Sequence, residues 1–327
     1  MDKIKEKLKK SYFIANKIYL FLIFIFLTIE DFSLGFYYFL ISLFIYGWKT
    51  LRSKVPIEVS KEFENRTFVY KRTKNRDLKL DLWLPSRTSK KNPLVFFCHG
   101  GGWISGFRNQ PNNVSWCKFL ASKGLAVVSI DYRYGYRNTM EDILSDYTDA
   151  LNYVRKNHKK LNIDRDNIVL MGLSAGGHLS LLYSTYHTNQ KNKKDMKGIK
   201  GVVAYYSPTD LNDIFISENK SIFARFATKQ TLKGSPVKKE EIYNYYSPIH
   251  WISDRMVPCL IAHGKMDTTV PFKSSVKLAK ALKKYKIKYT FLVHRKGGHS
   301  FDTKFKDIGT VNTLERTVRF IRKAIDI

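Results

Sequence analysis

The sequence is poor in cysteine and has no paired cysteine spacing. Its three cysteines are Cys98, Cys117 and Cys259. An odd number without a Cys-x-x-Cys pair excludes a disulfide framework and gives no zinc or redox motif. Cys98 and Cys259 lie in the apolar runs PLVFFC and VPCLIA, so we expect both to be buried packing residues. The sequence indicates neither a metal site nor a cofactor.

Acidic residues are also scarce. The chain has 57 Lys and Arg against 28 Asp and Glu, a formal net charge of +29. Residues 1–54 hold nine of the basic and four of the acidic residues, so +5 of the charge lies there and +24 is spread over the remainder. No Cys/His finger and no aromatic RNA-binding signature accompanies this charge. We therefore expect no nucleic-acid partner, and interpret the excess as a solvated lysine-rich surface or one facing an anionic membrane.

Long apolar runs occur only near the beginning of the chain. IYLFLIFIFLTI (residues 18–29) is followed by Glu30 and Asp31, and then by FSLGFYYFLISLFIYGW (residues 32–48). A cleavable signal peptide has one shorter apolar region and a small-residue cleavage site, whereas a membrane span needs about 20 apolar residues. Residues 1–54 are therefore predicted to be a membrane anchor of one or two transmembrane helices, and residues 55–327 a catalytic domain.

The acidic pair between the two runs favours two helices over one. A charged residue at the bilayer centre costs about 2.5 to 3.5 kcal/mol, so Glu30 and Asp31 fit better at the tip of a helical hairpin. Lysine and arginine flank both ends of the apolar stretch. By the positive-inside rule, a hairpin leaves the catalytic domain in the cytoplasm, whereas a single tilted span would place it outside.

The rest of the chain alternates apolar strands with amphipathic helices. This alternation predicts an α/β fold with a mainly parallel sheet and helices on both faces. Residues 211–246 are polar and rich in aromatics, and they are expected to form a cap over the active site. The predicted strands are residues 67–73, 78–85, 93–99, 125–134, 168–172, 201–206, 258–264 and 289–295, and the predicted helices are residues 114–123, 140–156, 175–185, 274–285 and the C-terminal segment.

The strongest chemical signal is GLSAGG, which places Ser174 directly after a predicted strand and before a predicted helix. This is the context of the G-x-S-x-G nucleophile elbow. The turn is sharp, so the backbone crowds the positions two residues before and two residues after the serine, where only glycine fits. Ser174 is therefore the predicted nucleophile.

A glycine-rich loop, HGGGW, follows the strand at residues 93–98. Acyl transfer builds negative charge on the substrate oxygen, and each preorganised N–H donor stabilises it by about 2.7 to 4 kcal/mol. Gly101 and Gly102 are the predicted donors from this loop, and Ala175 is the donor from the elbow. His99 is expected to support the loop through hydrogen bonds.

The remaining members of a catalytic triad follow in the expected order. Asp267 comes after the strand CLIAHG and His299 lies in GGHSF, beyond the last strand. The chain order Ser, Asp, His is typical of α/β hydrolases. His299 would take the proton of Ser174, and Asp267 would fix its tautomer. Asp210, which also follows a strand, is the alternative acid, while His178 and His250 are expected to be structural.

Together these motifs resemble those of the hormone-sensitive-lipase-like carboxylesterases of the α/β-hydrolase superfamily. HGGGW, DYRY, GLSAGG, HGKMDTTVPF and GGHSF carry the resemblance from about residue 69 to the C-terminus. Many bacterial members have Asp at the position of Leu173 and a different acid motif, and these departures lean toward feruloyl-esterase-like and kynurenine-formamidase-like branches. The resemblance implies hydrolysis of short or medium acyl esters without a cofactor.

The leading hypothesis is therefore a membrane-anchored serine carboxylesterase that acts on a small-molecule ester of apolar or amphiphilic character. An amidase or formamidase would use the same triad. A non-catalytic ligand-binding protein would keep the fold, although it would need neither the triad nor the glycine loop.

Overall fold

The computed structural model describes residues 53–326 apart from 60–62, 64 and 87–90. Lys54–Ile327 forms one compact unit. The apolar runs that predict a membrane anchor lie outside the described residues. Within the described residues, no helix combines the length and apolarity needed to cross a membrane.

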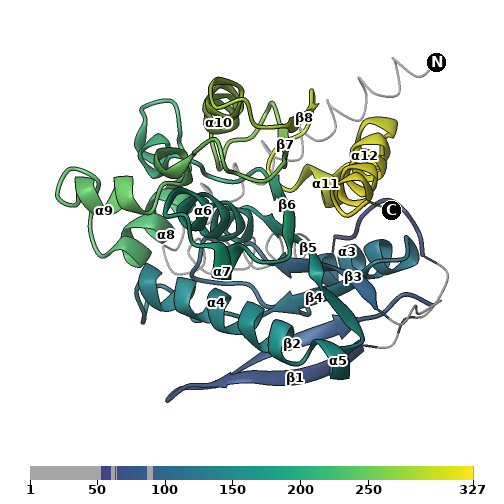
Figure 1. Ribbon diagram of the computed structural model, residues 1–327. Helices are drawn as coiled ribbons and strands as arrows, with labels where there is room; N and C mark the ends of the chain where they lie inside the picture. The colour runs from purple at the N-terminus through teal and green to yellow at the C-terminus, as the bar shows by residue number, and fades with distance from the viewer. Residues whose placement is uncertain (1–52, 60–62, 64, 87–90, 327) are drawn as a thin grey trace, which may run out of the picture. The chain divides into compact units, whose positions relative to one another are not determined.

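An eight-stranded mixed sheet forms the centre of this unit (Figure 1). The strand order is β1-β2-β4-β3-β5-β6-β7-β8. The β1 and β2 strands run antiparallel to their neighbours, and the six strands from β4 to β8 are parallel. The predicted mainly parallel sheet is thus confirmed. The strands are β1 (Asn65–Arg72), β2 (Asp77–Trp83), β3 (Asn92–Cys98), β4 (Ala126–Ile130), β5 (Ile163–Leu173), β6 (Ile199–Tyr205), β7 (Cys259–Gly264) and β8 (Tyr289–His294).

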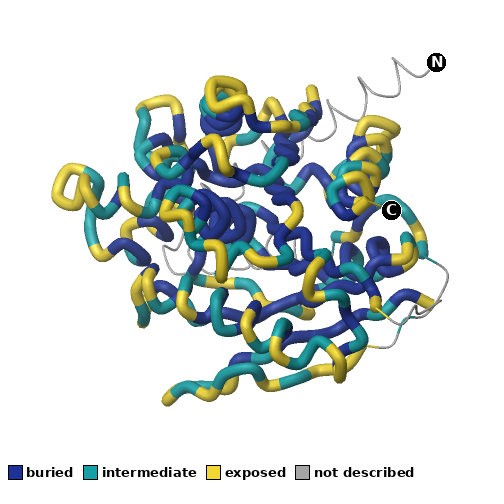
Figure 2. The backbone as a smooth tube through the Cα atoms, in the orientation of Figure 1, coloured by how far each residue is buried: buried dark blue, intermediate teal, exposed yellow. Residues whose placement is uncertain are grey.

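Helices cover both faces of the sheet, as the alternation of strands and helices predicts. Successive side chains of a strand point to opposite faces. In β3, Leu94 and Phe96 therefore pack toward α4 (Met140–Lys156), α6 (Ala175–Asn189) and α10 (Phe272–Lys284). Val95 and Phe97 pack toward α3 (Pro111–Ser122) and α12 (Ile308–Ala324) on the other face. Buried residues follow the strands and the inner sides of these helices in Figure 2.

Several element boundaries differ from those predicted. The β4 strand ends at Ile130, and the side chain of the next residue, Asp131, pairs with Arg108, 2.8 Å from carboxylate to guanidinium. The α3 helix begins three residues early, at Pro111, because proline fits the first helical position. The α6 helix continues to Asn189, since its second half is buried as well. Three one-turn helices were not predicted: α5 (His158–Leu161), α7 (Lys193–Met196) and α11 (Phe301–Lys304).

The polar insert between β6 and β7 folds into helical segments. They are η1 (Leu211–Phe215), α8 (Ile222–Leu232), α9 (Glu240–Tyr245) and η2 (Pro248–Trp251). Ser221 caps α8 by accepting a hydrogen bond from the amide of Ala224. A Cβ atom added to Gly102 would lie 2.9 Å from Cβ of Ala227 and 3.1 Å from Cζ of Phe223. The α8 helix therefore packs against the glycine-rich loop.

Candidate active site

Ser174 lies at the turn between β5 and α6. Its backbone has φ 51° and ψ −118°, a conformation that costs a non-glycine residue about 1–3 kcal/mol. The surrounding structure holds it there, and the amide of Ser174 donates to the carbonyl of Tyr205 at 2.8 Å. This is the strained strand-to-helix turn of a nucleophile elbow.

The two glycines flanking the elbow are required by close backbone contacts. A Cβ on Gly172 would overlap the backbone of Gly176, and a Cβ on Gly176 would overlap the carbonyl oxygen of Cys98. The crowding expected two residues before and after the serine is therefore present. A side chain at Gly172 would therefore push β5 and α6 apart at the elbow, and one at Gly176 would push the elbow away from β3.

Ser174, His299 and Asp267 form one hydrogen-bonded chain. Nε2 of His299 lies 3.0 Å from Oγ of Ser174, and its Nδ1 lies 2.8 Å from Oδ2 of Asp267. The loops after β7 and β8 make this possible because they are bonded together: the amide of Met266 donates to the carbonyl of Gly297 at 2.8 Å. The structure thus brings the three residues together, although Ser174 and His299 are 125 positions apart in the sequence.

Asp267 is held by four donors. Oδ1 accepts from the amides of Thr269 (2.7 Å) and Val270 (3.0 Å), and Oδ2 accepts from His299 and from Nε2 of His263 (3.1 Å). Burial alone would raise the pKa of the Asp267 carboxyl, but the charge of His299 and the hydrogen bonds from both histidines outweigh it and hold this pKa well below its usual value. Asp267 is therefore ionised at neutral pH.

His263 is a partner of Asp267 that the sequence reasoning missed. Its Nε2 faces two acceptors, Oδ2 of Asp267 and the carbonyl of Val270, both at 3.1 Å. Nε2 must therefore carry a proton, and in the neutral ring Nδ1 accepts from the hydroxyl of Ser275 at 2.7 Å. The only available signal was the spacing of four residues between His263 and Asp267 in HGKMD, which also suits an unrelated turn.

Three backbone amides near Ser174 are free to bind an anion. Within the described part of the chain, the N–H groups of Gly101, Gly102 and Ala175 donate to no protein acceptor. Gly101 and Gly102 have φ of 113° and 61°, so the loop adopts a conformation that favours glycine. Ala175 is the first residue of α6, where an N–H has no partner within the helix.

His99 lies beneath this loop. Nδ1 of His99 donates to the carbonyl of Gly100 at 2.6 Å, and its ring stacks on Tyr132 with 4.3 Å between centroids. Burial lowers the pKa of His99 to about 4, so the ring is neutral at pH 7. Tyr132 also donates its hydroxyl hydrogen to the carbonyl of His99 at 3.2 Å.

The other candidate residues lie elsewhere. Asp210 pairs with Lys277 at 2.8 Å, and in the described part of the chain its side chain makes no hydrogen bond or ion pair with His299. His178 is buried in α6 with Nε2 2.8 Å from the carbonyl of Tyr246. His250 is exposed in η2. Cys98, Cys117 and Cys259 are buried and unpaired, which confirms the packing role predicted for Cys98 and Cys259.

A second buried carboxylate lies behind His299. Asp302 accepts from Nε1 of Trp116 at 2.6 Å and from the hydroxyl of Tyr206 at 2.8 Å. The Tyr206 ring lies 4.6 Å from the His299 ring, centroid to centroid. No sequence pattern predicts this arrangement, since the three residues that make it come from α3, from α11 and from the position directly after β6.

The sheet topology and the hydrogen-bonded serine, histidine and aspartate define an α/β-hydrolase. The family described as BD-FAE matches residues 80–282, more than half of the chain. This protein therefore belongs to the BD-FAE family. The narrower resemblance to hormone-sensitive-lipase-like enzymes stays a prediction.

Two of the curated relatives are esterases by name. Esterase LipC of Mycobacterium tuberculosis is 27% identical over 232 residues, which cover 68% of this chain and 57% of LipC. The probable isoprenylcysteine alpha-carbonyl methylesterase ICMEL1 of Arabidopsis thaliana is 25% identical over 295 residues, covering 81% of this chain and 59% of that protein. The chain thus spans less than two thirds of the length of either relative.

Solved structures share the fold. A truncated carbohydrate esterase from gut microbiota aligns with a TM-score of 0.69 at 22% identity, covering 84% of this chain and all of that one (100%). The thermophilic esterase Est2 of the Planctomycetes species Thermogutta terrifontis aligns with a TM-score of 0.63 at 25% identity, covering 79% of this chain and 92% of Est2.

Proposed function

We propose that this protein is a serine carboxylic ester hydrolase with Ser174, His299 and Asp267 as its triad. The observation that carries the proposal is the continuous hydrogen-bonded chain from Oγ of Ser174 to the Asp267 carboxylate. Membership of the BD-FAE family and relatives named esterases support it. No cofactor takes part in the proposed reaction.

In the first half of the reaction, His299 accepts the Ser174 proton at Nε2 while Oγ attacks the ester carbonyl carbon. The carbonyl oxygen becomes an oxyanion and binds the N–H groups of Gly101, Gly102 and Ala175. When the intermediate collapses, the bond to the alkoxide breaks and His299 returns the proton to the leaving alcohol. Ser174 is left as an acyl ester.

In the second half, a water molecule takes the place of the alcohol. His299 removes one of its protons, and the hydroxide attacks the acyl carbon. Collapse of this intermediate releases the carboxylic acid, and the proton returns to Ser174. Throughout, Asp267 stabilises the imidazolium and holds the proton of the resting ring on Nδ1.

We further propose that the substrates are short-to-medium acyl or amphiphilic esters. Structures of Est2 with bound propionate and with bound butyrate support a short acyl group. The outer face of α8 supports an apolar portion, because Ile222 and Phe226 are 84% and 53% exposed on the helix that packs against Gly102.

The membrane anchor at residues 1–54, the cytoplasmic location of the catalytic domain and a kinship with hormone-sensitive-lipase-like enzymes remain proposals. They rest on the two apolar runs, the flanking basic residues and the motifs HGGGW and GLSAGG. Protease protection of the catalytic domain in intact cells tests the topology: a hairpin requires protection, and a single span requires digestion.

The enzymatic proposal is tested with p-nitrophenyl acetate and butyrate. Ser174→Ala should abolish both turnover and labelling by a fluorophosphonate. The matched control is Ser122→Ala, which removes the hydroxyl of an exposed residue at the end of α3 and should change neither. A wild-type protein without turnover or labelling would refute the proposal. An N-formyl anilide in the same panel separates esterase from formamidase activity.

A further inference from the structure

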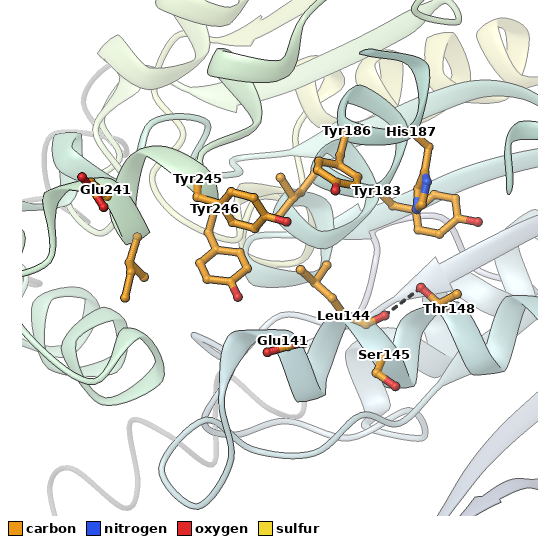
Figure 3. Close-up of a pocket in the computed structure, with 12 residues that line it drawn as sticks. Glu141, Leu144, Ser145, Thr148, Tyr183, Tyr186, His187, Glu241, Tyr245 and Tyr246 are labelled. Carbon is orange, nitrogen blue, oxygen red and sulfur yellow. Dashed lines mark hydrogen bonds between the residues drawn. The ribbon is translucent and has the colours of Figure 1, made fainter. Parts of the chain in front are cut away.

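A cavity lies away from Ser174, between α4, α6 and α9. We name it the tyrosine cavity, because Tyr183, Tyr186, Tyr245 and Tyr246 line it (Figure 3). Its volume is about 700 Å³, within the range of small-molecule sites. No triad or glycine-loop residue lines it. Leu182, on its wall, is eight residues along α6 from Ser174, which is about 12 Å at the rise of an α-helix.

The aromatic rings of this cavity stand at steep angles to one another. Tyr245 and Tyr246 have centroids 5.0 Å apart and planes at 88°, and Tyr186 and Tyr245 are 6.0 Å apart at 62°. Trp251 fixes this arrangement by donating from Nε1 to the carbonyl of Tyr245 at 2.6 Å. Aromatic rings at steep angles to one another suit a compact ligand group that contacts several of them, whereas a sugar ring would stack on one flat aromatic face.

The charge of the cavity is opposite to that of the protein. In a chain of net charge +29, the cavity lining includes Glu141 and Glu241 but no lysine or arginine. Among the described residues neither glutamate has an ion-pair partner. Figure 3 shows Glu141 beside Tyr246 and Glu241 set apart at the far side of α9. His187 adds no positive charge at pH 7, since burial lowers its pKa.

We propose that the tyrosine cavity binds a small organic cation, an alkylammonium or quaternary ammonium head group. The electron-rich faces of Tyr186, Tyr245 and Tyr246 attract the cation, and the carboxylate of Glu141 balances its charge. This site is independent of the triad, so it goes beyond ester hydrolysis.

The test uses the full chain carrying Ser174→Ala, purified in a non-ionic detergent so that no choline-like detergent competes. Saturation-transfer NMR measures the binding of choline and of its uncharged isostere 3,3-dimethylbutan-1-ol. Choline should bind, and the isostere should bind about tenfold more weakly or not at all. Because Ser174 is absent, the outcome does not depend on the proposed hydrolysis, which is measured separately.

Variants locate the site. Tyr245→Leu should weaken choline binding about two- to fivefold, the effect of one exposed cation–π contact. Glu141→Gln should weaken it by up to about fivefold, the effect of one exposed charge pair, whereas Tyr245→Phe keeps the ring and should bind as before. Tyr136→Leu, an exposed tyrosine outside the cavity, is the control. Absence of choline binding, equal binding of the isostere, or unchanged binding by Tyr245→Leu and Glu141→Gln would overturn the proposal. Binding of a methyl glycoside without binding of choline would also overturn the proposal.

Discussion

Replacing Asp267 by asparagine separates its charge from its shape. The carboxylate is an acceptor at all four of its contacts, from Thr269, Val270, His263 and His299. Asparagine has one oxygen and one NH₂ group. If the oxygen keeps the two amides, the NH₂ group must face the two histidines.

An NH₂ group in that position reverses the hydrogen bond to His299. Nδ1 of His299 then becomes the acceptor, and the proton of the neutral ring moves to Nε2, opposite Oγ of Ser174. His299 can no longer take the Ser174 proton, so we expect kcat to fall by about 10⁴-fold, the size of effect that the corresponding substitution has in serine proteases. KM should change little, because Asp267 is buried behind His299 and touches no substrate.

Steady-state hydrolysis of p-nitrophenyl butyrate measures this effect, and urea unfolding verifies that the variant is folded. The control is Asp210→Asn, which alters the other carboxylate at a strand end, one that pairs with Lys277. It should leave kcat within about twofold, since Lys277 keeps its second partner, Asp213, and a partly exposed pair contributes little. If folded Asp267→Asn kept a tenth or more of the wild-type kcat, the conclusion that Asp267 fixes the tautomer of His299 would be refuted.

Two further substitutions test the loop and the buried histidines. Gly102→Ala places a Cβ 2.9 Å from Ala227 at a φ of 61° and should lower kcat about 10²-fold by displacing the loop. The control is Gly124→Ala, at φ 87° with open space around it, which should leave kcat unchanged. Equal effects of the two substitutions on kcat would contradict the steric argument. Burial lowers the pKa of His178 to about 4 from 6.5. The unfolded chain therefore binds this proton first, and the stability from the neutral ring is complete above pH 6.5 and is lost as pH falls toward 4. Between pH 7.5 and 5, wild type should lose about 2 kcal/mol more unfolding free energy than His178→Gln, as measured by urea titration; equal losses would show that His178 is not the titrating group.

Most of the sheet was predictable because its strands are short buried runs. The run at residues 93–98 is apolar at every position after Pro93, as expected for a strand covered on both faces. Residues 140–156 have a capping box at Thr139 and an apolar face, and the α4 helix has the predicted bounds. The elbow was predictable because G-x-S-x-G between a strand and a helix is a motif within one short segment.

The insert and the partners of the triad were not predictable, because their contacts span the chain. Residues 211–246 were expected only as a cap, and nothing local shows that Phe223 and Ala227 meet Gly102, more than 100 positions away. The tyrosine cavity likewise needs α4, α6 and α9 in place together. A motif fixes the chemistry of a segment, while such contacts depend on the completed fold.

Two buried carboxylates, Asp267 and Asp302, lie near the His299 imidazole, and they differ in the hydrogen-bond donors that surround them. Asp267 accepts four hydrogen bonds, and the charge of His299 and the two histidine contacts hold its pKa low despite burial. Asp302 is also buried, but among the described residues its side-chain donors are Trp116 and Tyr206, and burial raises its pKa. The charge that stabilises a His299 imidazolium is that of Asp267, whose Oδ2 lies 2.8 Å from Nδ1 of His299. Asp302 instead fixes Tyr206, whose ring 4.6 Å from His299 limits how far the imidazole can turn from Ser174.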